Sequence, residues 1–221
     1  MKEMNVEESR GSRAKYLAII GDVVRSRDIQ DRNEFQQRLR GGISKVNQEF
    51  SSSIASRFVL TIGDEFQGLL KSPEVIPQLL AVIRSEIHPI EQRIGIGIGN
   101  LDTKLEPVAI GMDGPCFHRA RDAIERAKSF ETSIEVESGK SNEPFRIYSL
   151  LYSNLRRGWT PRQRQVFDLS MIGMAGNVIA QQLRITPSAI SQHLSAVGAD
   201  VVFNATRIWV DVLVDIFNST E

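Results

Sequence analysis

Two aspartates in the N-terminal half of the chain are spaced so that their carboxylates can act together. Asp22 directly follows the apolar run of residues 16–20, and Asp64 stands with Gly63 between two short apolar runs. Two carboxylates held close together repel each other unless a cation lies between them. Mg²⁺ suits such a position, because it takes one or two carboxylates plus substrate phosphates. The alternative makes Asp22 a turn residue and Asp64 an ordinary hairpin residue.

The spacing of apolar residues predicts the elements that must position these aspartates. Strands are expected over residues 16–20, 58–62, 66–70, 93–99, 134–136 and 145–151, and helices over 33–50, from Pro73 onward and over 117–128. Gly63 and Asp64 are expected at a tight hairpin. The order β-α-β-β-α-β-α-β predicts an α+β fold of the ferredoxin-like palm type. In a palm the first strand and the hairpin are neighbours, so Asp22 and Asp64 should meet at one edge of the sheet.

Glycines mark three places where a ligand can approach the backbone closely. Alternate glycines in the strand over residues 93–99 put its bulk on one face and leave the other face bare. A loop rich in Gly and Pro, residues 109–115, follows that strand. The glycines we expect to contact a nucleotide are Gly63, Gly95, Gly97 and Gly111.

These segments resemble a known family. Residues 16–27, 60–70, 93–100 and 111–123 are similar to the SatD family of bacterial proteins, and the resemblance covers roughly residues 15–152. With the helical tail, it extends to the whole chain. More distantly, the same segments resemble the catalytic domain of class III nucleotide cyclases, which is also a palm fold.

The resemblance to cyclases implies roles for individual residues. Asp22 and Asp64 fall on the two aspartates that bind divalent metals, so the implied cofactor is Mg²⁺ or Mn²⁺. The carbonyl group of Val23 is implied as a further ligand. Arg121 falls on the arginine that stabilises the transition state. Metal and phosphate binding are therefore expected at this edge of the palm.

The chain also departs from the cyclase pattern. Leu60 and Thr61 stand where cyclases usually carry a lysine that reads the base, and Phe117 or His118 stands where they carry an asparagine. Losing a group that stabilises the transition state costs several kcal/mol. The resemblance therefore implies metal and phosphate binding more strongly than cyclisation.

Beyond Asn154 the pattern predicts helices only, and we place a domain boundary at about residues 152–158. Helices are expected from Thr160, over residues 177–183, over residues 186–197 and over residues 199–218. The second and third of these are similar to the helix-turn-helix of sigma-factor-like and response-regulator output domains. The last helix carries a long apolar stripe, which indicates a dimer seam or a cover for the palm.

In a helix-turn-helix the second helix of the motif reads base edges. The side chains expected to face DNA bases are Ser188, Ser191 and above all Gln192, and those expected to contact phosphates are Arg162, Arg164 and Arg184. The alternative is a helical bundle that dimerises and does not touch DNA. Residues 151–221 hold six arginines and five acidic residues, whereas DNA-binding modules are usually more basic.

The composition excludes several classes of protein. The 27 basic and 27 acidic residues of this 221-residue chain cancel, so no overall charge attracts nucleic acid or a membrane. One cysteine, Cys116, excludes a disulfide framework. The sequence has no run of 18 apolar residues, so it predicts no membrane span. We expect a cytoplasmic protein with a disordered segment (residues 1–14), a palm domain (15–152) and a helix-turn-helix domain with a dimerisation helix (153–221).

Two main functions fit these expectations. The first is a homodimeric, DNA-binding transcriptional regulator whose palm senses an unidentified nucleotide or a divalent metal. The second is a metal-dependent nucleotidyl cyclase or transferase whose helical tail only dimerises it. A third possibility is that the palm is an inactive scaffold for interactions.

Overall fold

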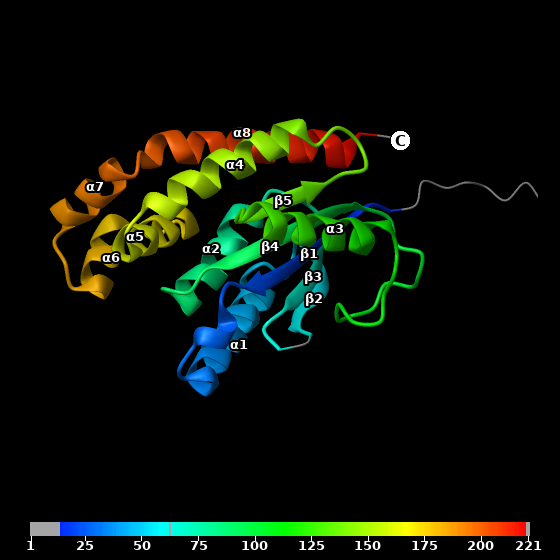
Figure 1. The fold of residues 1–221 in the computed structure, drawn as a ribbon, viewed down its shortest axis with the longest axis horizontal. Helices are drawn as coiled ribbons and strands as arrows, with labels where there is room; N and C mark the ends of the chain where they lie inside the picture. The colour runs from blue at the N-terminus through cyan, green and yellow to red at the C-terminus, as the bar shows by residue number, and fades with distance from the viewer. Residues whose placement is uncertain (1–13, 62, 220–221) are drawn as a thin grey trace, which may run out of the picture.

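The computed structural model describes residues 14–61 and 63–219, so the expected disordered segment 1–14 lies outside the described residues except for its last member. A five-stranded sheet with the order β2-β3-β1-β4-β5 forms the centre of the fold (Figure 1). The strands are β1 (Tyr16–Val23), β2 (Ile54–Leu60), β3 (Phe66–Leu70), β4 (Gln92–Gly99) and β5 (Ile134–Glu137). Neighbouring strands are antiparallel except β4 and β5, which are parallel. The expected α+β class is confirmed.

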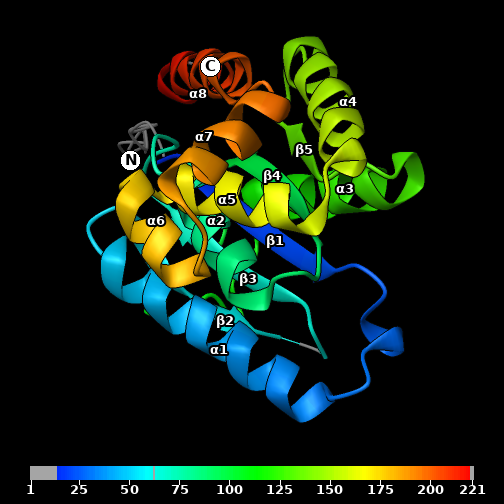
Figure 2. The ribbon, with the colours of Figure 1, turned by 90° about the vertical axis from the view of Figure 1, so that its left-hand side faces the viewer.

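Helices pack on both faces of the sheet. They are α1 (Arg32–Glu49), α2 (Ile76–Ile87), α3 (Pro115–Phe130), α4 (Glu143–Gly158), α5 (Pro161–Ile172), α6 (Gly176–Leu183), α7 (Pro187–Ala196) and α8 (Ala199–Asn218). Figures 1 and 2 show α3 on one side of the sheet and α5, α6 and α7 gathered at one end of the molecule. A short 3-10 helix, Ser26–Asp28, links β1 to α1.

The alternation of side chains along β1 decides which helices it meets. Leu17 and Ile19 belong to the large core that includes α1 and α2. Ala18 and Ile20 face the other way and pack with residues of α3. Asp22 follows them at the same two-residue spacing, and it lies within β1 rather than after it. The strand therefore directs the Asp22 carboxylate toward the α3 face.

The expected strand over residues 145–151 is wrong, because these residues lie within α4 and mostly in its first half. Pro144 lies in the first turn of α4, where proline is well tolerated. The buried positions are spaced by three or four residues, as in a helix, and they are Phe145, Ser149, Tyr152, Ser153 and Arg156. The aromatic and β-branched residues that suggested a strand are divided between the buried and exposed faces of this helix.

The helical tail shares its core with the sheet. Trp159, Phe167, Trp209 and Leu213 belong to the same buried cluster as the isoleucines of β4. The ring of Tyr148 stacks on that of Trp209 with their centroids 5.1 Å apart, which joins α4 to α8. Helix α4 runs without interruption through the boundary expected at residues 152–158. The tail therefore packs directly on the palm.

A buried ionic network also joins the tail to the palm. Asp168 of α5 accepts hydrogen bonds from Arg84 of α2 at 2.8 Å and from Arg156 of α4 at 2.7 Å. Arg156 also donates to Glu91 at 2.9 Å, and Arg164 of α5 lies 3.3 Å from Glu91. The side chains of Arg84, Arg156 and Asp168 are nearly inaccessible to solvent. Each buried charge is therefore balanced by an opposite charge.

Candidate functional site

The hairpin between β2 and β3 brings Asp64 to the site. Thr61 donates a backbone hydrogen bond to Glu65 at 2.8 Å, which closes the turn. Gly63 has a φ of 68°, a backbone conformation that glycine adopts without strain. The Oδ2 atom of Asp64 is buried and has no hydrogen-bond partner within the described part of the chain. A buried carboxylate oxygen without a partner is costly, so this atom is suited to a ligand that the protein itself does not supply.

The electrostatics at Asp22 show that the two aspartates share one environment. Burial raises the pKa of Asp22, the charge of Lys128 opposes this rise, and the charge of Asp64 adds to it. In the sheet Asp22 pairs with Arg93 of β4, whose charge also lowers the pKa of Asp22. Asp22 and Asp64 therefore lie near enough for their charges to interact, and their joint action on a cation stays a prediction. Their repulsion is what a bound cation would relieve.

A carboxylate and an arginine that touch each other lie beside the aspartates. Arg121 of α3 donates two hydrogen bonds to Glu65, at 2.6 and 2.8 Å. This bond from Arg121 is the largest cause of the lowered pKa of Glu65. The hydroxyl group of Thr61 also donates to Glu65, at 3.3 Å. Arg121 is therefore held at the site by the residue next to Asp64.

Sequence reasoning did not select Glu65 or Lys128. Glu65 follows Asp64 directly, so its position at the turn was available as a signal. Lys128 lies seven residues after Arg121 on α3, and two helical turns place such residues on the same face. Together the site holds the carboxylates of Asp22, Asp64 and Glu65 and the cations of Arg121 and Lys128.

The donor set fits some cations better than others. Within the described ranges, no group of three or more His, Cys, Asp or Glu side chains is arranged to hold a metal ion. That does not suit zinc, whose sites usually take at least three protein ligands. Two carboxylates do suit Mg²⁺ or Mn²⁺, which complete their coordination with water and phosphate oxygens. Val23 ends β1 with a buried side chain and pairs with Gln92 of β4.

The structure gives the glycines of β4 a different role from the expected contact with a nucleotide. A Cβ atom on Gly97 would lie 2.1 Å from the carbonyl oxygen of Cys116, and one on Gly95 would lie 2.4 Å from that of Ala120. The bare face of β4 is thus filled by the backbone of α3. Gly63 and Gly111 differ, because both have a positive φ and open space around them.

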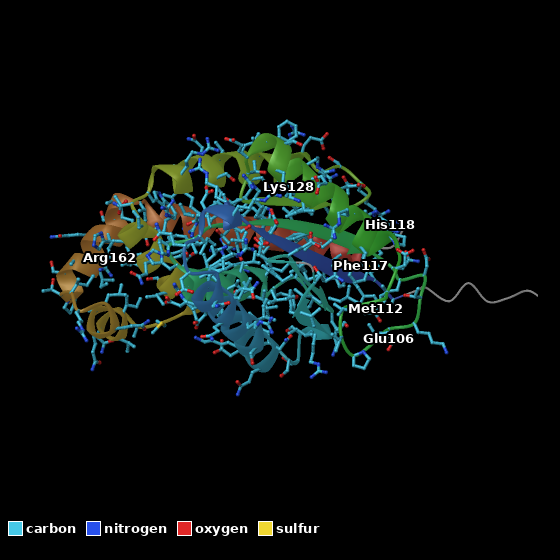
Figure 3. All side chains as sticks on the ribbon, turned by 60° about the horizontal axis from the view of Figure 1, so that its bottom comes forward. Glu106, Met112, Phe117, His118, Lys128 and Arg162 are labelled. Carbon is cyan, nitrogen blue, oxygen red and sulfur yellow. The ribbon has the colours of Figure 1, made fainter. Side chains whose placement is uncertain are left out.

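The start of α3 holds three further residues that the sequence analysis singled out. Phe117 and His118 lie near the start of α3 (Figure 3). Phe117 packs in the core of the α3 face, and the Nε2 atom of His118 lies 2.6 Å from a carboxylate oxygen of Asp113. Cys116 is buried, as expected, and burial raises the pKa of its thiol to about 12. Such a thiol is a poor nucleophile at neutral pH.

A family model described as the SatD family matches residues 16–213. The chain belongs to the SatD family. Among curated proteins, none matches it. No helix of the described residues is long and apolar enough to cross a membrane.

Several solved structures are similar in fold to this SatD protein. A bacterial light-regulated adenylyl cyclase has 13% sequence identity and a TM-score of 0.43, covering 58% of this chain and 78% of its own. The monomeric guanylyl cyclase domain of the RhoGC fusion protein from the aquatic fungus Blastocladiella emersonii has 18% identity and a TM-score of 0.34, covering 49% and 74%. A dimeric form of that domain has 16% identity and a TM-score of 0.35, covering 56% and 79%.

The tail of the SatD protein places most of the residues expected to contact DNA on the surface. Helices α6 and α7 are joined by a turn in which Arg184 has a φ of 54°. The exposed side chains are Arg162, Arg184, Ser188, Ser191 and Gln192. Arg162 lies on the helical tail, far from His118 on α3 (Figure 3). The expected contact of Arg164 with DNA phosphate is wrong. Arg164 pairs with Glu91, and only 19% of its side chain is exposed.

Proposed function

We propose that this SatD protein binds a nucleoside triphosphate with Mg²⁺ or Mn²⁺ beside Asp22 and Asp64, and that it acts as a metal-dependent nucleotidyl cyclase or transferase. The observation that carries the proposal is the unpartnered, buried Oδ2 atom of Asp64 beside a second carboxylate whose pKa is raised. This geometry supports a cation and its phosphate ligand better than it supports a purely structural role.

Each side chain of the site has a proposed role. Asp22 and Asp64 would hold the ion, with the carbonyl group of Val23 as a further candidate ligand. The bound ion would neutralise phosphate charge and make the phosphorus easier to attack. Arg121 and Lys128 would contact phosphate oxygens and so orient the nucleotide. Because Glu65 already accepts two hydrogen bonds from Arg121, the phosphate must share or displace that partner.

The two residues that stand where cyclases carry a base-reading lysine are poorly suited to recognise a base. Leu60 is apolar, and the hydroxyl group of Thr61 is already bonded to Glu65. Gly63 and Gly111 have open space around them, and we propose them as the glycines that a nucleotide approaches. All four common nucleotides therefore belong in the test.

Turnover tests the proposal. The wild type, Asp64→Asn and Glu74→Gln are incubated with Mg²⁺ or Mn²⁺ and with ATP, GTP, CTP or UTP, and the products are separated by anion exchange. Glu74 is an exposed carboxylate remote from the hairpin, so its variant controls for the loss of a charge. We expect one nucleotide to release pyrophosphate, with at least a 100-fold loss in Asp64→Asn and no change in Glu74→Gln. Turnover that survives Asp64→Asn contradicts the proposal. Metal-dependent binding of nucleotide without turnover contradicts the proposed enzymatic activity and leaves the proposed binding.

DNA binding by the tail is a second candidate function. Ser188, Ser191 and Gln192 are exposed on α7, which follows the turn at Arg184. We propose that a homodimer presents two such helices and that nucleotide binding favours one spacing between them. The test is retention of random-sequence duplex DNA, selected over several rounds, at two salt concentrations. A salt-sensitive complex that Gln192→Ala weakens at least tenfold supports this role, and absence of any selected sequence contradicts it.

A further inference from the structure

Helices α4 and α8 enclose an apolar groove that the proposed site does not use. They lie side by side on the opposite side of the molecule from α1 (Figure 2). The aromatic rings of Tyr148, Tyr152 and Trp209 line the groove, and Tyr148 bonds Thr206 of α8 at 2.8 Å. The groove is bordered by the apolar side chains Ile147, Leu151, Leu155, Val201, Ile208 and Val212.

The exposure of these side chains is concentrated rather than scattered. Six of the ten large apolar side chains that are exposed in the described ranges lie on α4 and α8. The exposed fraction is 62% for Leu151, 73% for Val201 and 56% for Ile208. Single exposed apolar residues are normal on a soluble protein, whereas a contiguous patch marks a site of interaction.

The charges around the groove argue against a membrane surface as the occupant. No charged side chain lines the groove. On α8, Arg207 and Asp211 form an ion pair at 3.3 Å, whereas Arg146 of α4 lies over the ring of Phe130 of α3, away from the groove. Helices that lie on anionic lipid are rich in basic residues. Because none of the described residues that line the groove is basic, an apolar protein surface fits the groove better than anionic lipid does.

The apolar face carries a ridge as well as a groove. Ile147, Leu151 and Leu155 follow one another at a spacing of four residues and form a ridge along α4. Such a ridge fits into the groove between two helices. Because the ridge and the groove lie on one face, a two-fold axis places the ridge of each protomer in the groove of the other.

The size of the face is sufficient for a specific interface. Two adjacent helices of 16 and 20 residues present roughly 500–600 Å². A pair of such faces would bury roughly 1,000–1,200 Å², which reaches the area of about 1,000 Å² that a biological protein–protein interface should clear.

We infer that a second copy of this chain occupies the groove, so that α4 and α8 of two protomers form an isologous four-helix interface. The interface does not depend on the proposed nucleotide site, because the hairpin that carries Asp64 lies on another part of the molecule (Figure 1). Dimerisation through α4 and α8 would leave the side of the sheet that α3 covers outside the interface.

Analytical ultracentrifugation of the full chain tests this inference. The wild type, Leu151→Glu, Ile208→Glu and Val178→Glu are compared at 1–100 µM, with circular dichroism as a check of folding. Val178 is an exposed apolar residue of α6 outside the groove, so its variant is the matched control. We expect the wild type and Val178→Glu to sediment at twice 24.8 kDa. Leu151→Glu and Ile208→Glu should each raise the dimer dissociation constant at least tenfold.

Cross-linking provides a test that does not depend on a disruptive variant. Cys116 is the single cysteine and is buried, so Ile208→Cys introduces the accessible thiol. A bismaleimide should link two Ile208→Cys chains and should not link two Val178→Cys chains. A wild type that is monomeric at 100 µM overturns the inference and leaves a different protein as the occupant. A dimer that neither glutamate variant weakens also overturns it.

Discussion

Asp22 is an acid that is harder to ionise in the folded chain than in water. Burial is the largest cause of its raised pKa, and the charge of Asp64 adds to it. Because the pKa is raised in the folded state, protonated Asp22 contributes to the stability of the fold below its ordinary pKa. That contribution is lost as the pH rises through the raised value. Above that window, the ionised Asp22 weakens the metal-free fold.

Removing this charge should therefore stabilise the metal-free protein. We expect Asp22→Asn to raise the melting temperature at pH 7 by roughly 1–3 °C, because 1 kcal/mol corresponds to about 2–4 °C for a chain of this size. The side chain remains partly exposed, which limits the effect. Differential scanning calorimetry with a chelator measures it, and the gain should disappear near pH 3. A lower melting temperature at pH 7 would show that the Asp22 charge has a favourable partner.

Among the described elements, β4 and α3 share the most extensive contact. The glycines of β4 allow the α3 backbone to lie directly on the strand, and that contact places Arg121 and Lys128 above Asp22. The position of α3 is thus set by the absence of side chains at Gly95 and Gly97. A side chain there would displace the cations of the site together with the helix.

Gly97→Ala tests that contact. The added Cβ would lie 2.1 Å from the carbonyl oxygen of Cys116 and 2.2 Å from the amide nitrogen of Ala120, so α3 must move. We expect a loss of about 3 kcal/mol or more in the free energy of unfolding, measured by urea denaturation. Gly41→Ala is the control, since nothing lies within 4 Å of its Cβ, and alanine should stabilise α1 by about 0.5–1 kcal/mol. Equal effects of the two changes would contradict this account of β4.

Most elements of the palm follow from local patterns in the sequence. Apolar runs predicted β1, β3 and β4, and helical spacing predicted α1 and α3 within a few residues. The segment over residues 145–151 misled the prediction, because its aromatic and β-branched residues favour a strand while Pro144 begins a helix. The glycines of β4 were correctly identified as a bare face. Whether a ligand or α3 fills that face depends on tertiary packing, which local patterns do not encode.

The candidate site was predictable to the extent that its residues lie at recognisable strand ends and turns. Asp22 was predicted from its place near the end of a strand, Asp64 from its place in a hairpin, and Arg121 only from the resemblance to cyclases. Glu65 could have been selected from its position after Asp64, but its pairing with Arg121 depends on how α3 crosses the hairpin, and so does the position of Lys128. Arg164 was assigned to DNA for its charge alone, and its partner Glu91 is distant in the sequence.

At the scale of the whole molecule, the buried network at Asp168 holds the tail on the palm. Two nearly inaccessible arginines from different helices donate to this one carboxylate. The charges of Arg156 and Arg84 lower the pKa of Asp168 against the effect of burial. Its stabilising contribution is therefore present above the ordinary pKa of aspartate and is lost as the pH falls through the lowered value.

Asp168→Asn should be among the most damaging single changes in the chain. It leaves the charges of Arg84 and Arg156 buried with less compensation, and breaking such a pair typically costs about 3–5 kcal/mol. Glu86→Gln is the control, since it removes only the exposed pair with Lys45 and should change stability by about 0.5 kcal/mol or less. Urea denaturation of both variants gives the comparison. A loss below about 1 kcal/mol in Asp168→Asn would show that the tail is held by apolar packing instead.

Asp22 and Asp64 together are proposed to hold a divalent cation. The most direct measurement is a titration with Mn²⁺ followed by electron paramagnetic resonance, in which bound Mn²⁺ loses its free-ion signal. We expect the wild type and Glu74→Gln to bind Mn²⁺ at neutral pH, more tightly with a nucleoside triphosphate present. Asp22→Asn and Asp64→Asn should each weaken binding at least tenfold, and binding should also weaken as the pH falls and Asp22 is protonated. Mn²⁺ binding that is equal in all four proteins, or absent from the wild type with and without nucleotide, would contradict the claim.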